Sequence, residues 1–66
     1  MAVKLTEPEK IILEKIAEGA SYEDCARETG YSHGTIRNLA HQLCEKLGAD
    51  NIRHAVAIGF RRELLK

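Results

Sequence analysis

A chain of 66 residues is long enough for one small domain, and its ten basic and ten acidic residues leave a net charge of zero. A domain this short buries only about 60% of the surface that its unfolded chain exposes, which leaves little material for a deep catalytic cleft. No apolar run approaches the roughly 18 residues of a membrane span, and no signal peptide is visible. We therefore expect a single cytoplasmic domain over residues 1–66 that is not an enzyme and has no membrane contact.

The charges are distributed unevenly along the chain. Residues 1–28 hold four basic and seven acidic residues, whereas residues 29–66 hold six basic residues, three acidic residues and all three histidines. An anionic partner is therefore expected to approach the C-terminal half, although an asymmetry of this size also arises by chance in short chains.

The first half of the chain predicts two helices, at about residues 7–18 and 22–29, and strand signals are nearly absent. Thr6 and Glu9 have the spacing of a capping box, so the first helix should begin there. Its buried stripe is expected to consist of Ile12, Leu13, Ile16 and Ala17. Ser21 should cap the second helix, and Gly30 should end it because glycine tolerates the left-handed exit conformation. The inward residues of the second helix are expected to be Tyr22, Cys25 and Ala26.

The second half predicts two longer helices, at about residues 33–47 and 51–64. Tyr31 is expected to be an apolar plug, Ser32 to cap the third helix, and Asp50 or Asn51 to cap the fourth. Spacings of three and four give the buried stripe of the third helix, namely Ile36, Leu39, Ala40, Leu43 and Leu47. The corresponding stripe of the fourth helix is Ile52, Ala55, Val56, Phe60 and Leu64. A two-turn helix, a turn with glycine and a longer helix form the spacing of a helix-turn-helix.

The outer face of the third helix is polar and almost free of acidic residues. It consists of His33, Gly34, Arg37, Asn38, His41, Gln42 and Glu45. Arg37 has the chemistry to bind guanine O6 and N7, and Asn38 has the chemistry to pair with adenine; His41 lies on the same face. Ser21 and Thr35 lie near helix starts, where phosphate is favoured, and Lys46 adds a charge at the far end. This face predicts recognition of double-stranded DNA in the major groove; the alternative is an ordinary solvated face.

The sequence resembles the LuxR-type (GerE-like) DNA-binding domain from residue 5 to about residue 62. The matching residues, in chain order, are Leu5-Thr6, Glu9, Leu13, Ala17-Glu18-Gly19, Ser21, Ala26, Gly30, Ser32, Thr35-Ile36-Arg37, Lys46-Leu47-Gly48 and Ala55-Val56. The resemblance implies an all-α, four-helix helix-turn-helix domain that regulates transcription. It also implies base contacts from Arg37, Asn38 and His41. Backbone contacts are expected from Ser21, Thr35, Gln42 and Lys46. Gly34 and Leu39 depart from the pattern, because lysine and histidine respectively are frequent there, and both departures predict weaker binding.

The fourth helix is expected to form a homodimer, as this resemblance implies. Apolar residues run more than half way around it, and the expected contacts are Ile52, Ala55, Val56 and Gly59. The alternative is that the core of one protomer covers all of them. A second hypothesis for function is an interaction protein that pairs with a larger LuxR-type regulator and modulates its DNA binding.

The two cysteines and three histidines of this sequence do not have the spacing of a metal-binding motif. No Cys-x-x-Cys pair occurs, and Cys25 and Cys44 both fall among apolar helical positions. We expect two reduced core cysteines, no bound metal and no cofactor.

Overall fold

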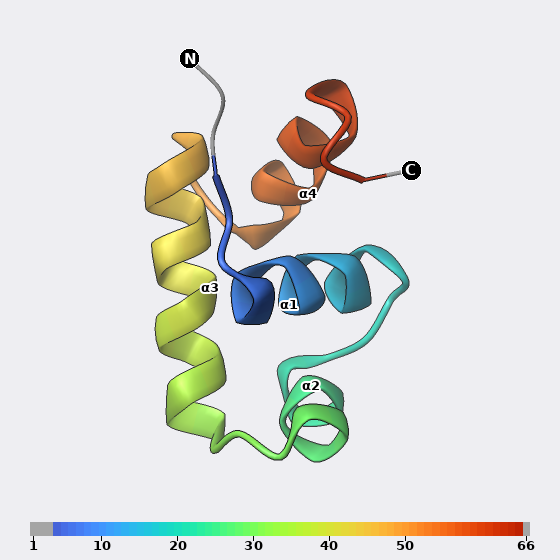
Figure 1. Ribbon diagram of the computed structural model, residues 1–66, viewed down its shortest axis with the longest axis vertical. Helices are drawn as coiled ribbons and strands as arrows, with labels where there is room; N and C mark the ends of the chain where they lie inside the picture. The colour runs from blue at the N-terminus through green and yellow to red at the C-terminus, as the bar shows by residue number, and fades with distance from the viewer. Residues whose placement is uncertain (1–3, 66) are drawn as a thin grey trace.

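The computed structural model describes residues 4–65, which contain four helices and no strand. They are α1 (Glu7–Ala17), α2 (Tyr22–Thr29), α3 (His33–Leu47) and α4 (Ile52–Arg61). Helix α3 packs against the other three: α1 crosses its middle, α2 lies at its N-terminal end and α4 lies near its C-terminal end (Figure 1). The all-α prediction is confirmed, and the first three helices lie within one residue of their predicted bounds. None of the described helices has the length and apolar character that crossing a membrane requires.

Local chemistry sets where each helix begins and ends. Thr6, Ser21, Ser32 and Asn51 each accept a hydrogen bond from the backbone N–H three residues on, so Asn51 rather than Asp50 caps α4. Capping boxes form at the starts of α1 and α2. Gly30 ends α2 with φ at 82°, a left-handed conformation that glycine adopts without steric cost. Only three residues, 30–32, separate the end of α2 from the start of α3.

The core is a single apolar cluster at the junction of all four helices. Its most deeply buried large side chains are Ile12 and Leu13 of α1 and Ile36 and Leu43 of α3, all with 0% exposure. Half-buried residues on every helix pack around this cluster. Helices α1, α2 and α4 therefore hold α3 in place through its buried face, and the opposite face is exposed.

The predicted end of the fourth helix at residue 64 is wrong. Helix α4 ends at Arg61, and the chain turns back at Glu63, which has φ at 61°. The N–H groups of Leu64 and Leu65 both donate to the Gly59 carbonyl, at 2.8 and 3.1 Å. After this turn Leu65 is buried in the core, 7% exposed.

Two aromatic residues predicted to be apolar packing residues are exposed. Tyr31 is 41% exposed because its turn lies at the end of the molecule, beyond the reach of the core. Phe60 is 48% exposed because the inward face of α4 is occupied by Ala55, Ile58 and Gly59. The expectation that Phe60 belongs to the buried stripe of the fourth helix is therefore wrong.

A buried ion pair, which the sequence analysis missed, connects α1 to α3. The Glu9 side chain is only 1% exposed, and its Oε1 accepts from the Thr6 N–H at 2.8 Å and from Lys46 Nζ at 2.6 Å. Burial by itself raises the pKa of Glu9, but the hydrogen bonds from Lys46 and Thr6 outweigh it and hold the pKa below its ordinary value. The carboxylate is thus kept charged and joins the start of α1 to the last turn of α3.

Candidate nucleic-acid interface

The face of α3 opposite the core is polar and exposed. Helix α3 turns Ile36, Ala40, Leu43 and Leu47 into the core. The residues on the opposite side of α3 are all exposed, namely His33, Gly34, Arg37, Asn38, His41, Gln42 and Glu45. A major groove about 12 Å wide admits a helix of this kind, so the free face is sterically able to enter it.

The three predicted base-contacting residues lie together on this face. Arg37 and Asn38 are adjacent, and His41 follows one turn after Arg37. Arg37 makes no ion pair with any described residue, so its guanidinium is available to an outside partner. His41 Nε2 lies 3.5 Å from Glu45 Oε1, and both side chains are well exposed. The face therefore presents two groups able to bind base edges and one that is shared with a neighbouring carboxylate.

The residues predicted to contact the DNA backbone differ in the hydrogen bonds that they already make within the protein. The Ser21 side chain accepts from the Asp24 N–H at 3.1 Å, and Thr35 Oγ1 accepts from the Ser32 hydroxyl at 2.9 Å. Each hydroxyl keeps its own proton for a further acceptor. Gln42 is exposed on α3 and makes no hydrogen bond within the described chain.

Lys46 stands apart from the other predicted backbone contacts. Its ammonium group lies 2.6 Å from the buried Glu9 carboxylate, so its charge is already compensated within the protein. The sequence prediction assumed a free charge at this position. We accordingly leave Lys46 out of the proposed interface and treat it as a residue that holds α3 to α1.

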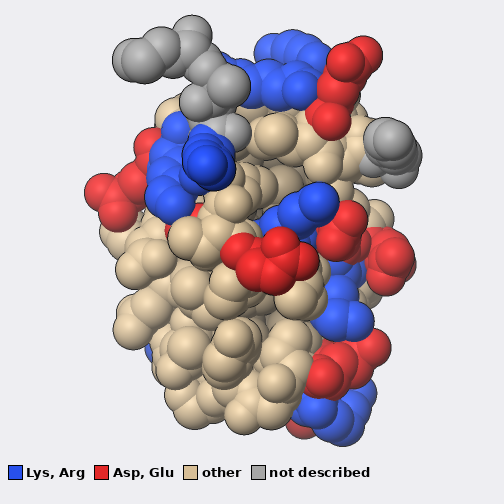
Figure 2. Space-filling view, viewed as in Figure 1, with Lys and Arg blue, Asp and Glu red and all other residues tan. Residues whose placement is uncertain are grey.

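The start of α3 differs electrostatically from the starts of α1 and α2. Those two helices carry acidic residues in the first turn, whereas the first turn of α3 has none. In the view of Figure 2, Lys, Arg, Asp and Glu are sparse at the lower left, where the first half of α3 lies, and gather toward the top and right. An approaching phosphate therefore meets no carboxylate in the first turn of α3, and the positive end of the helix dipole favours it.

The four predicted dimer contacts divide into two pairs. Ala55 is 0% exposed, and Gly59 is buried, because both face the core of their own protomer. A Cβ added at Gly59 would lie 3.0 Å from Leu65 Cδ1 and 3.2 Å from Leu13 Cδ2. The smallness of Gly59 thus serves packing within one chain, so Ala55 and Gly59 are corrected to core residues. Ile52 and Val56 are half-buried and keep surface that a partner is able to cover.

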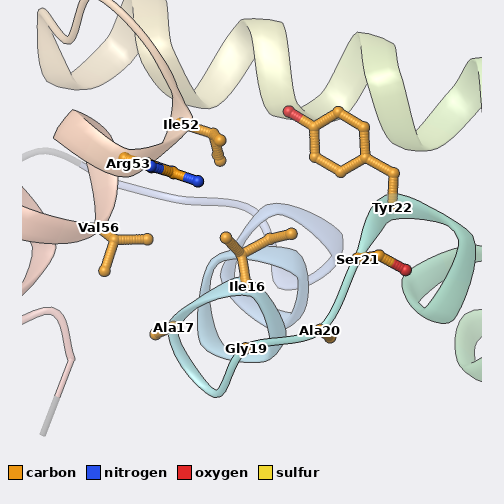
Figure 3. Close-up of a pocket in the computed structure, with 9 residues that line it drawn as sticks. All are labelled: Ile16, Ala17, Gly19, Ala20, Ser21, Tyr22, Ile52, Arg53 and Val56. Atoms are coloured by element: carbon orange, nitrogen blue, oxygen red, sulfur yellow. The ribbon is translucent and has the colours of Figure 1, made fainter.

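A surface hollow of about 430 Å³ lies between α1, the start of α2 and α4. Figure 3 shows Ile16, Ile52 and Val56 turned into it, with the Arg53 guanidinium reaching in from α4. The Ser21 hydroxyl points away, in keeping with its role as the cap of α2. Tyr22 forms one wall, and burial raises the pKa of its phenol. The lining of the hollow is mainly apolar. It includes Ile52 and Val56 of α4 and residues of the loop after α1.

Both cysteines are free thiols, as predicted. Cys25 is buried in the core and Cys44 is half-buried, and burial raises the pKa of each thiol. Raised pKa values disfavour the reactive thiolate, so the cysteines act as packing residues. Among residues 4–65, no group of three or more His, Cys, Asp or Glu side chains is arranged to hold a metal ion.

Comparison with known proteins places this helix-turn-helix in a family. Residues 1–56 match the family described as the vWA-MoxR associated protein N-terminal HTH. The chain is 42% identical over 60 residues to the methanol utilization control regulatory protein MoxX of Paracoccus denitrificans, covering 91% of this chain and 27% of MoxX. It is 36% identical over 52 residues to the transcriptional regulatory protein DesR of Bacillus subtilis, covering 79% of this chain and 26% of DesR.

The fold has a close counterpart among solved structures. A chain in the crystal structure of the phage VqmA–DPO complex superimposes with a TM-score of 0.88 at 27% sequence identity, covering 94% of this chain and 28% of that one. The chain thus spans about a quarter of the length of the relatives that it matches. The LuxR-type resemblance of the sequence is confirmed. The chain belongs to the vWA-MoxR associated protein N-terminal HTH family, and its helix-turn-helix is of the LuxR (GerE-like) type found in transcriptional regulators.

Proposed function

We propose that the protein binds double-stranded DNA sequence-specifically and regulates transcription, with α3 in the major groove. The observation that carries this proposal is the polar outer face of α3, on which the adjacent residues Arg37 and Asn38 are both exposed. Arginine reads guanine and asparagine reads adenine through paired hydrogen bonds. The relatives named as transcriptional regulators support the same function.

In this proposal each part of the interface has a separate task. Arg37, Asn38 and His41 contact base edges, and the hydroxyls of Ser21 and Thr35 together with Gln42 contact phosphates. Phosphate contacts fix the register of the protein on the duplex, and base contacts choose the sequence. The net charge of zero predicts modest affinity, because few phosphates are neutralised and few counterions released.

Arg37→Ala is expected to weaken binding to a specific site roughly five- to 150-fold, about 1–3 kcal/mol, because a paired contact to guanine is lost. The site is first selected from a randomised duplex library with the 66-residue protein. Fluorescence anisotropy then measures affinity for the selected duplex and for a scrambled one, at low and moderate salt. The variant is expected to lose most of the preference for the selected duplex.

Arg61→Ala is the matched control, since it removes the same charge from the last turn of α4, away from the outer face of α3. It is expected to leave the preference for the selected duplex unchanged. The proposal fails if the unaltered protein binds no DNA at low salt, or binds all sequences equally.

We further propose that two copies bind together on DNA through the outer surface of α4. Ile52 and Val56 are half-buried, Ala57 is exposed and Phe60 is 48% exposed, which leaves an apolar strip along this helix. Phe60→Ser is expected to weaken the pairing roughly tenfold, because part of the burial energy of an aromatic side chain is lost. Sedimentation with and without the selected duplex measures the stoichiometry, and one protomer per duplex at saturation would contradict the dimer.

A further inference from the structure

The chain has five glycines, and the structure of the protein itself does not explain why glycine stands at every one of these positions. Gly19, Gly30 and Gly48 have φ at 99°, 82° and 68°, which disfavours other residues. Gly59 leaves room for core side chains, because an added Cβ would lie 3.0 Å from Leu65 Cδ1. These four positions are explained by backbone conformation or by packing.

Gly34 has neither explanation. It lies in the first turn of α3 without a positive φ, and it is exposed. A Cβ built there meets only Ser32 Oγ, at 4.0 Å, so the protein has room for a side chain. Glycine disfavours a helix relative to alanine. The protein thus carries a less stable residue at a site where its own structure does not require one, which points to a group outside the chain.

The position of Gly34 indicates what that group is. Gly34 lies one turn before Arg37 and Asn38 on the same stripe of α3. Without a side chain, this is where the α3 backbone is able to come closest to a surface that the stripe contacts. The Cα hydrogens of Gly34 form an apolar spot, and the thymine methyl is the apolar group that base pairs present in the major groove.

We propose that Gly34 is a specificity-determining residue that accommodates a thymine methyl group against the backbone of α3. This inference rests on the proposed DNA binding of the same face. It assigns a preference for thymine next to the bases read by Arg37 and Asn38. A larger side chain at position 34 would hold the helix away from the base edge and weaken the contacts of both neighbours.

Gly34→Ala separates folding from recognition. The variant is expected to melt at a higher temperature than the unaltered protein, because alanine favours the helix. Its affinity for the selected duplex is expected to fall at least tenfold. Its affinity for the scrambled duplex, and the salt dependence of binding, are expected to stay unchanged because no phosphate contact is lost.

Uracil, which lacks the thymine methyl, identifies the base. Each thymine of the selected duplex is replaced by uracil in turn, and the affinity of Gly34→Ala is measured for every duplex. At one position the replacement is expected to recover at least half of the affinity that Gly34→Ala loses, measured on a logarithmic scale. Unchanged affinity of Gly34→Ala for the selected duplex would overturn the proposal. Equal losses on both duplexes, or no rescue by uracil at any position, would overturn it too. Absence of DNA binding by the unaltered protein would instead refute the proposed function itself.

Discussion

Leu43→Ala is expected to lower the free energy of unfolding by about 2–5 kcal/mol, because it leaves a cavity at the centre of the core. Leu43 is fully buried on α3, in the cluster to which all four helices contribute. A domain of this length has a total stability of roughly 3–10 kcal/mol, so the loss is a large share of it. Urea unfolding followed by circular dichroism measures the change. The variant is expected to be partly unfolded at 37 °C.

Gln42→Ala is the matched control for this experiment, because Gln42 is the exposed neighbour of Leu43 on the same helix. Its effect on unfolding is expected to stay within about 0.5 kcal/mol, as for most surface substitutions. Equal losses for the two variants would contradict the core that the structure describes, since they would show that burial at position 43 contributes nothing.

Lys46→Met is expected to cost about 2–3 kcal/mol of stability at pH 7, because it leaves the buried Glu9 carboxylate without its cation. Removing one partner of a fully buried pair typically costs about 3–5 kcal/mol, and we expect less here because the Lys46 side chain is 38% exposed. The methionine retains most of the apolar stem, so the loss reports mainly on the charge. Urea unfolding at pH 7 measures it.

The cost of Lys46→Met is expected to shrink in acid. The pKa of Glu9 is lowered in the folded protein, so the pair stabilises the fold fully above the ordinary carboxyl pKa of about 4.3. This stabilisation is lost as the pH falls through the lowered value, because the carboxylate becomes protonated. Unfolding measured from pH 7 down to pH 2 therefore should show the two proteins converging.

Two further variants test whether the pair itself is responsible. Lys10→Met removes an exposed lysine of α1 that has no ion pair among residues 4–65, and it is expected to change stability by less than about 0.5 kcal/mol. Glu9→Gln combined with Lys46→Met is expected to recover part of the loss, since the amide leaves no unpaired charge. A loss that is the same at every pH, or no recovery in the double variant, would rule out the pair as its cause.

The candidate interface was largely predictable from the sequence because a helical period sorts residues into two faces. Ile36 and Leu43 repeat at spacings that place them on one side, and Arg37 and His41 then fall on the other. The caps Thr6 and Ser32 could be identified because capping depends on contacts within one turn of helix. The helical period predicts on which face of α3 these residues lie, but it does not predict what they bind.

Local patterns alone determined the four helices within residues 4–65, the turn at Gly30 and the face on which Arg37 lies, because each depends on residues a few positions apart. The tertiary structure decided three other points. It paired Lys46 with Glu9, 37 positions away in sequence, and it turned Gly59 into the protomer's own core. It also ended α4 early so that Leu65 could fill that core. These features depend on which segments meet in space, and a periodic pattern carries no information about the partner on the other side of a contact.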